Sequence, residues 1–150
     1  MASAELPSAS TNGDTRTVSL DQLFDADTLF QLRSAVAAHG ASLGVAEPVL
    51  GDLVLVAHEL ASNAVRHGQA DANDPGRLRL WRDGDLVVCE VSDHGPGLTD
   101  PVGVGRQPAP PGASGGRGLW IVRQVSRDLD IRTGPTGTTV TAAVPAPGVG

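Results

Sequence analysis

Apolar residues recur at helical spacing in two stretches of the N-terminal half of the chain. After Asp25 or Asp27, either of which can cap a helix, apolar side chains return every three or four residues as far as Gly40. A second stretch begins near Pro48 and ends at Gly68, a residue type that commonly follows a helix. The pattern predicts two helices, whose apolar positions are Leu29, Leu32, Val36 and Ala37 in the first and Leu50, Leu53, Val54, Ala57, Leu60, Ala61 and Ala64 in the second.

Alternating apolar and polar residues predict a β-hairpin between positions 77 and 91. The runs 77–82 and 85–91 are separated by Asp83-Gly84, a dipeptide typical of two-residue turns. Such a turn would place Leu80 opposite Val87, Leu78 opposite Cys89 and Arg77 opposite Glu90, with one face buried and the other facing water. Continuing the alternation places Asp93 on the buried side just past the strand, where a carboxylate needs a partner.

A second hairpin is predicted near the C-terminus, with strands at 129–133 and 138–144 joined through 134–137. Pairing Thr133 with Thr138 would turn Thr138 inward. A third helix is expected over about 116–126. Before it, the segment 98–114 holds four prolines and little periodicity, which is typical of a functional loop such as a lid. Residues 16–20 could form a short strand.

This order of elements favours an α+β fold, a two-layer sandwich with a mostly antiparallel mixed sheet and helices on one face. At 150 residues and 40% hydrophobic content, the chain suits a single domain. We expect that domain to span 16–145. Residues 1–15 are expected to be a disordered tail, because they offer almost nothing apolar to bury, and 146–150 a short C-terminal tail.

The charged residues exclude several classes of function. The formal net charge is -6, and all eleven cationic side chains are arginine, so no lysine is present for a Walker-type phosphate loop or a Schiff base. An acidic chain without a basic run argues against nucleic acid as a partner. The lone Cys89 has no disulfide partner, and no apolar run is long enough to cross a membrane. We therefore expect a cytoplasmic protein that does not associate with membranes.

Glu59 and Asn63 lie four residues apart in the second predicted helix and share a face beside the apolar stripe. A solvated pair on an amphipathic helix would have the same spacing. An amide oxygen also suits Mg²⁺, which takes few protein ligands, and a nearby carboxylate can accept a proton from an attacking hydroxyl. The pair is a candidate for metal binding through Asn63 and for catalysis through Glu59.

Asp93 is followed by glycines at positions 95 and 97. A strand that ends in a tight glycine turn would explain this pattern without any ligand. A carboxylate on the core side, however, suits the exocyclic amino group of adenine, and Gly95 and Gly97 would let a flat ring approach the backbone. We interpret these residues as a candidate purine site.

Glycines also precede the third predicted helix, in the run Gly115-Gly116-Arg117-Gly118. They could form a flexible hinge, and they could also expose N–H groups at a helix start, where phosphate oxygens bind. Both roles can coexist. Arg117 could add charge at the phosphates or simply be a solvated surface residue. In the last hairpin, Thr138 is expected to face the ligand.

Taken together, HELASNAVRHG, VSDHGPGL, GGRGLWIV and GTTV resemble the N, G1, G2 and G3 boxes of the GHKL ATPase superfamily, in the same order. The match covers roughly 50–144 and is most similar to the stand-alone, RsbW-like anti-sigma-factor serine kinases. The resemblance implies the Bergerat fold, with ATP held between helices and sheet under a mobile lid. It also implies Mg²⁺ at Asn63, adenine at Asp93 with help from Thr138, and further nucleotide contacts from Gly95, Gly97, Gly115, Gly116, Arg117, Gly118 and Leu119.

The same resemblance implies a serine/threonine kinase that acts in transcription regulation. With Glu59 as the base, it would phosphorylate a STAS-type antagonist and would sequester a sigma factor until the unphosphorylated antagonist displaced it. A homodimer is implied as well. Two alternatives remain open: a nucleotide-responsive binding module without phosphotransfer, and a histidine-kinase-type catalytic domain that acts with a separate phosphoacceptor. A plain α+β interaction domain would bind no nucleotide.

Overall fold

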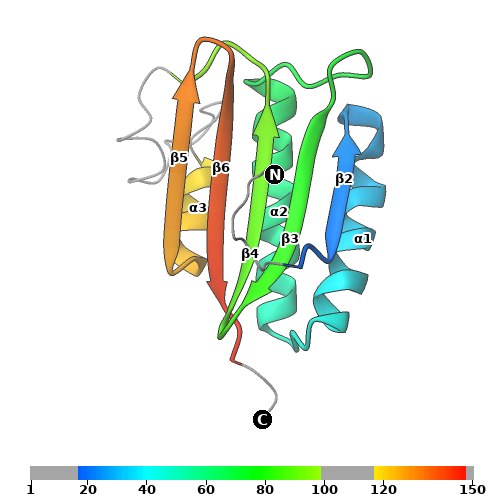
Figure 1. Ribbon diagram of the computed structural model, residues 1–150, viewed down its shortest axis with the longest axis vertical. Helices are drawn as coiled ribbons and strands as arrows, with labels where there is room; N and C mark the ends of the chain where they lie inside the picture. Colours follow the sequence, from blue (N-terminus) through cyan, green and yellow to red (C-terminus); the bar gives the residue numbers. More distant parts are fainter. Residues whose placement is uncertain (1–16, 99–116, 148–150) are drawn as a thin grey trace, which may run out of the picture.

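The computed structural model describes residues 17–98 and 117–147. Three α-helices pack on one face of a five-stranded sheet with the strand order β2-β3-β4-β6-β5 (Figure 1). The strands are β2 (Leu20–Phe24), β3 (Gly76–Asp83), β4 (Leu86–Asp93), β5 (Asp128–Gly134) and β6 (Gly137–Pro145). The helices are α1 (Leu29–Ser42), α2 (Val49–Arg66) and α3 (Arg117–Val125), with a 3-10 turn, η1 (Ala26–Thr28), before α1.

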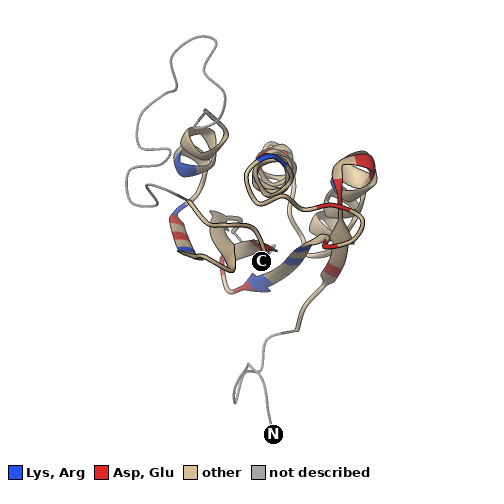
Figure 2. Ribbon diagram, turned by 90° about the horizontal axis from the view of Figure 1, so that it is seen from above, with Lys and Arg blue, Asp and Glu red and all other residues tan. Residues whose placement is uncertain are grey.

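All four strand pairings are antiparallel. Viewed along the strands, the helices form one layer on one side of the sheet (Figure 2). The other sheet face carries the ion pairs Arg77–Asp21 and Arg79–Glu90, whose residues alternate with the buried Leu78 and Leu80. This arrangement confirms the predicted α+β class with helices on one side. The tails expected over 1–15 and 146–150 lie mostly outside the described residues.

The first helical stretch begins with a reciprocal cap at Asp25. The Asp25 carboxylate accepts a hydrogen bond from the Asp27 backbone N–H at 2.9 Å, and the Asp25 N–H donates to the Thr28 hydroxyl at 2.9 Å. The helix continues past its predicted end at Gly40 to Ser42. Gly40 is buried there, and a Cβ at this position would lie 2.8 Å from the Leu50 side chain. This glycine allows α1 and α2 to pack closely and does not terminate the helix.

The first strand also differs from its prediction at 16–20. β2 spans Leu20–Phe24 and pairs with β3, with Leu20 opposite Leu80. Leu20 and Phe24, at the two ends of this strand, are both buried in the core. The strand therefore lies where both of these apolar side chains can be removed from water, which stabilises the fold by roughly 1.5–3 kcal/mol for each large side chain.

The predicted register of the first hairpin was wrong by two residues. Leu80 lies opposite Cys89, and Leu78 lies opposite Val91, because the turn is centred on Gly84 and Asp85. Gly84 has a φ of +59°, at the position where two-residue turns of type II′ take glycine. A shift of two residues leaves every side chain on its predicted face. The second hairpin has the predicted register, with Thr133 opposite Thr138.

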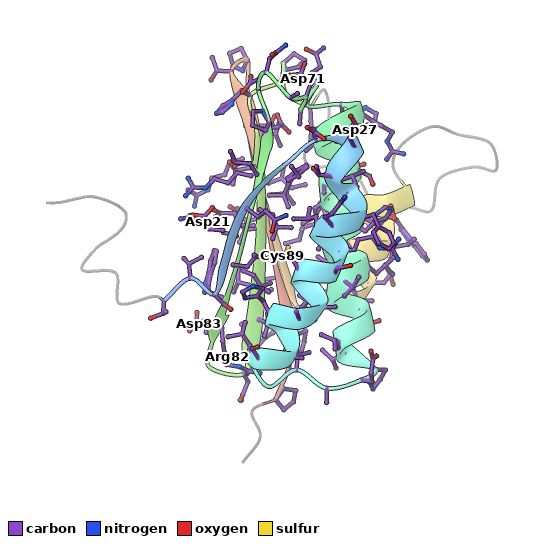
Figure 3. All side chains as sticks on the ribbon, turned by 90° about the vertical axis from the view of Figure 1, so that its right-hand side faces the viewer. Asp21, Asp27, Asp71, Arg82, Asp83 and Cys89 are labelled. Carbon is purple, nitrogen blue, oxygen red and sulfur yellow. The ribbon has the colours of Figure 1, made fainter. Side chains whose placement is uncertain are left out.

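Arg82 stabilises the end of the sheet that carries the Gly84 turn. Its Nε donates to the Leu43 carbonyl at 2.8 Å, and its Nη1 donates to the carbonyls of Gly84 and Ala146 at 2.9 and 2.7 Å. One side chain thus joins the end of α1, the β3–β4 turn and the residue after β6. Figure 3 shows Arg82 and Asp83 at this end, Asp71 at the opposite end and Cys89 between them.

Candidate functional site

Four of the predicted site residues meet at the end of the sheet opposite Arg82, namely Asp93, Gly95, Gly97 and Thr138. There β4 ends, β6 begins and the C-terminal end of α2 packs above them (Figure 1). The β4–β6 register places Asp93 directly opposite Thr138. Two motifs that are more than forty residues apart in the sequence are therefore neighbours in the sheet.

Asp93 is partly buried and lies against the end of α2. Its Oδ1 accepts a hydrogen bond from the Gly95 N–H at 2.8 Å. A Cβ built on Gly68 would lie 2.7 Å from Asp93 Oδ1 and closer still to Cγ and Oδ2. The carboxylate thus occupies the space that a side chain at position 68 would need. Within the described residues, no hydrogen bond reaches Asp93 Oδ2, which leaves this oxygen able to accept one from a ligand.

Gly68 has a different role from the one predicted for it as a helix-ending residue. The helix does end there, with the His67 and Gly68 N–H groups donating to the Asn63 carbonyl at 2.8 and 3.3 Å. The left-handed backbone conformation, however, falls on Gln69, with φ 58°. Glycine is required at position 68 because Asp93 lies against it.

The glycine turn after Asp93 packs between α2 and the β5–β6 hairpin. Gly95 is buried, and a Cβ there would lie 2.6 Å from the Gly68 carbonyl carbon. Gly97 has a φ of +93°, and its Cβ would lie 2.5 Å from the Gly134 oxygen. Both glycines predicted as site residues are thus needed for close backbone approach. At the start of β6, a Cβ on Gly137 would collide with the Asp93 carbonyl oxygen.

Thr138 is the only buried polar or charged side chain among the described residues. Its Oγ1 lies 2.8 Å from Oγ1 of Thr133, which in turn accepts a hydrogen bond from the Leu98 N–H at 2.9 Å. Sequence reasoning placed Thr133 opposite Thr138 but gave it no role. The signal that could have found it is this pairing of two threonines on the inward face of one hairpin.

Glu59 lies one turn before Asn63 on α2 and faces α3. A Cβ at Gly118 would lie 2.7 Å from Glu59 Oε1, so the carboxylate contacts the backbone of the first turn of α3. The fold therefore brings the Glu59 motif and the Gly118 motif together. Both Glu59 and Asn63 are partly exposed.

Asn63 presents an amide oxygen on the surface of α2, next to a positively charged side chain. Its Oδ1 accepts a hydrogen bond from the Arg66 guanidinium at 2.8 Å, on the surface of α2. The positive charge of Arg66 would repel a cation at this oxygen, although the oxygen keeps a second lone pair. A hard oxygen donor that leaves room for several waters suits Mg²⁺.

Several predicted site residues either lie outside the described part of the chain or pack in the core. Gly115, Gly116 and the expected lid beyond Leu98 lie outside the described residues, as does the Arg117 side chain. Leu119 is buried and its side chain packs in the hydrophobic core. Any contact between Leu119 and a nucleotide would have to come from its backbone.

Sequence reasoning also missed a polar rim beside the Asp93 turn. Asp71 accepts hydrogen bonds from the backbone N–H groups of Asn73 and Asp74, both at 2.9 Å, which shapes the loop before β3. Asp74 Oδ1 lies 2.7 Å from Nδ1 of His94, the residue after Asp93. Both partners are well exposed, so the contact is a surface interaction at the edge of the site.

Within the described ranges, no helix is long and apolar enough to span a membrane. A comparison with curated proteins found no match.

Solved structures with a similar fold include bacterial regulatory and kinase domains. One contains the RsbU and RsbW domains of Rv1364c from Mycobacterium tuberculosis, with 23% identity and a TM-score of 0.57, covering 87% of this chain and 34% of that one. Another is the histidine kinase domain of a blue-light-activated histidine kinase from Erythrobacter litoralis, with 21% identity and a TM-score of 0.50, covering 80% of this chain and 64% of that one. The chain thus spans about a third of the first structure and just under two thirds of the second, and at these identities the likeness concerns the fold.

A family model describes most of the sequence. The model for the histidine kinase-like ATPase domain matches residues 24–144, from the end of β2 to the last residues of β6. The matched range includes Glu59, Asn63, Asp93 and Thr138, and the fold agrees with the predicted GHKL architecture. The chain therefore belongs to the histidine kinase-like ATPase domain family.

Proposed function

We propose that the chain binds Mg·ATP at the Asp93 end of the sheet and transfers its γ-phosphate to a serine or threonine of a protein partner. The observation that carries the proposal is the placement of Asp93. Its carboxylate is fixed by Gly95 and Gly68 but keeps Oδ2 available, and it lies across from the buried Thr138. A fixed acceptor beside a hydroxyl suits the amino group and ring nitrogen of adenine.

The residues assigned to the phosphates lie on the two helices that flank this position. Asn63 would hold Mg²⁺, which supplies charge neutralisation at the phosphates. The backbone around Gly118, at the start of α3, would offer N–H groups at the positive end of a helix dipole, together with Gly115 and Gly116. We assign Arg117 a supporting charge there.

Glu59 is proposed as the catalytic base. It contacts the backbone at Gly118 and is partly exposed, so an entering hydroxyl could reach it. Glu59 would accept the proton of that hydroxyl while the oxygen bonds to phosphorus and ADP leaves. Phosphoryl transfer of this kind depends mainly on positioning and on electrostatic stabilisation.

The proposed partners are a STAS-type antagonist as phosphoacceptor and a sigma factor as the sequestered protein, with a homodimer of this chain as the working assembly. Support comes from the motif resemblance to anti-sigma-factor kinases and from the fold shared with a structure that contains an RsbW domain. A glutamate at position 59 favours a serine or threonine acceptor. Under this proposal, the protein acts in the cytoplasm and takes part in transcription regulation.

The test is a titration of the full chain with Mg·ATP and Mg·GTP, followed by a transfer assay. We expect the wild type to prefer ATP and Asp93→Ala to lose binding. Asp130→Asn is the matched control, because Asp130 is exposed on β5 and its ion-pair partner Arg132 is exposed as well. Equal affinity for ATP and GTP, or tight ATP binding by Asp93→Ala, would contradict the proposed purine site.

The transfer arm uses Glu59→Gln, which should bind Mg·ATP as the wild type does and should not phosphorylate a STAS partner. Transfer by this variant at the wild-type rate would remove Glu59 from the role of base. Binding without transfer by the wild type would favour a nucleotide-responsive binding module. Acid-labile phosphate on the acceptor would favour the histidine-kinase alternative, because phosphoserine is stable in acid.

A further inference from the structure

Thr133 joins two parts of the candidate site, although it belongs to none of the four motifs. Its hydroxyl lies 2.8 Å from that of Thr138 and accepts a hydrogen bond from the Leu98 N–H at 2.9 Å. Thr138 is buried opposite Asp93, and Leu98 follows the glycine turn. One hydroxyl therefore connects the β6 strand inside the site with the backbone where that turn ends.

The surrounding backbone holds Thr133 and the glycine turn in direct contact. A Cβ on Gly97 would lie 3.0 Å from Thr133 Oγ1 and 2.5 Å from the Gly134 oxygen. The positive φ of Gly97, +93°, directs the chain onto the hairpin at this point. The Leu98 N–H thus donates to a side chain on a neighbouring strand, and the turn depends on that hydroxyl for its partner.

The donors and acceptors around Thr133 indicate which of the two threonine hydroxyls donates to the other. A threonine hydroxyl has one proton and two lone pairs, and one lone pair of Thr133 is used by Leu98. If Thr133 donates its proton to Thr138, successive bonds polarise one another in the same direction. The Thr138 proton is then left for an acceptor on the ligand, beside the free acceptor oxygen of Asp93.

We propose that Thr133 is a positioning residue that orients the Thr138 hydroxyl as a donor and thereby sharpens the preference for adenine. This inference rests on the proposed function. Adenine presents an amino donor where guanine presents a carbonyl acceptor, and the next ring atom is an acceptor only in adenine. An acceptor at Asp93 beside a donor at Thr138 matches adenine alone. A threonine chosen only for strand propensity would have no such effect.

The experiment combines nucleotide titration with backbone amide exchange on the full chain. Thr133→Val removes the hydroxyl and keeps the shape, Thr133→Ala is a second variant without a hydroxyl, and Thr133→Ser restores the hydroxyl. The control is Thr141→Val, on the same strand as Thr138, because the Thr141 hydroxyl bonds to Glu90 on the other face of the sheet. Thermal unfolding of each variant accompanies the titration.

We expect Thr133→Val and Thr133→Ala to bind Mg·ATP about tenfold more weakly, with little change for Mg·GTP, and Thr133→Ser and Thr141→Val to match the wild type. Exchange of the Leu98 amide, measured without nucleotide, should be faster in the two variants that lack the hydroxyl. Wild-type ATP affinity in Thr133→Val, or equal losses in Thr133→Ser, would overturn the inference. If the wild type itself binds no ATP, the proposed function fails. Unchanged exchange of the Leu98 amide in the variants without the hydroxyl would separately refute the hydrogen bond from Leu98 to Thr133.

Discussion

The two ends of the sheet are held together in opposite ways. At the Arg82 end, one guanidinium makes hydrogen bonds to three main-chain carbonyls from three separate segments. At the Asp93 end, segments meet through glycines, and a polar side chain keeps an acceptor oxygen without a partner among the described residues. One end uses its polar groups for the fold, while the other leaves an acceptor oxygen that the proposed nucleotide could use.

This difference reflects a conflict between stability and binding. A polar group that is fully hydrogen-bonded within the protein adds to stability but has nothing left to offer a ligand. Binding sites therefore carry local arrangements that stability alone would not select. The two ends can be separated experimentally, because changes at the Asp93 end should affect binding and changes at the Arg82 end should affect unfolding.

The largest effect is expected for Gly68→Ala. The new methyl group would occupy the place of the Asp93 carboxylate, which must then move away from its position beside Thr138. We expect Mg·ATP affinity to fall by about a hundredfold, equivalent to roughly 2.7 kcal/mol, with cooperative unfolding retained. The measurement is calorimetric titration of the variant beside the wild type.

Gly51→Ala is the matched control for that substitution. Gly51 is exposed in α2, the helix that Gly68 follows, and its Cβ would lie 3.2 Å from the flexible end of the Glu47 side chain. Alanine is a better helix former than glycine by about 1 kcal/mol, so this variant should bind ATP normally and unfold no more easily. Normal ATP binding by Gly68→Ala would show that the carboxylate need not lie against α2.

Arg82→Met should lower stability and leave nucleotide binding unchanged, which is the reverse of the result expected for Gly68→Ala. It keeps the aliphatic stem but removes hydrogen bonds to the carbonyls of Leu43, Gly84 and Ala146. Nη2 of Arg82 is buried, and no group among the described residues accepts a hydrogen bond from it, so part of the stability gained from the three hydrogen bonds is offset in the wild type. We expect the free energy of unfolding to fall by about 2 kcal/mol, with nucleotide affinity unchanged.

Urea unfolding of Arg82→Met should be compared with that of Arg132→Met. Arg132 is exposed on β5 and, among the described residues, forms an ion pair with the exposed Asp130, so its loss should change stability by less than about 0.5 kcal/mol. A drop in ATP affinity for Arg82→Met without any loss of stability would mean that the two ends are coupled through the sheet.

Much of the Asp93 end could be predicted from the sequence, because local patterns determine it. The Thr133–Thr138 register followed from the short hairpin loop, and the face of Asp93 followed from strand alternation. The first hairpin was misplaced by two residues because Asp-Gly and Gly-Asp turns both satisfy the pattern. The structure distinguishes them because Asp83 pairs with Leu86 and so belongs to the strand and not to the turn.

Contacts between distant segments could not be predicted in this way. That Gly68 makes room for Asp93, or that Gly118 lies against Glu59, depends on how α2 and α3 pack on the sheet. The three acceptors of Arg82 are backbone carbonyls, which carry no sequence signal at all. Sequence patterns thus predicted candidate site residues but not the packing contacts that position them.

The smallest effect is expected on the open sheet face, between the two ends. Asp21 and Arg77 form a two-point ion pair there, and Asp21 lies on the side away from the helices (Figure 3). The hydrogen bond from Arg77 lowers the pKa of the Asp21 carboxyl below its ordinary value of 3.8. A carboxyl with a depressed folded-state pKa adds stability above pH 3.8, and this is lost as the pH falls through the folded pKa.

Asp21→Asn should therefore lower stability slightly at neutral pH, and its difference from the wild type should shrink at an acidic pH below 3.8. Both side chains of the pair are about half exposed, so solvent screening limits the effect to less than about 1 kcal/mol. Urea unfolding at the two pH values, with and without added salt, measures it. A difference that persisted in acid, or that did not shrink in salt, would mean that Asp21 acts through packing and not through its charge.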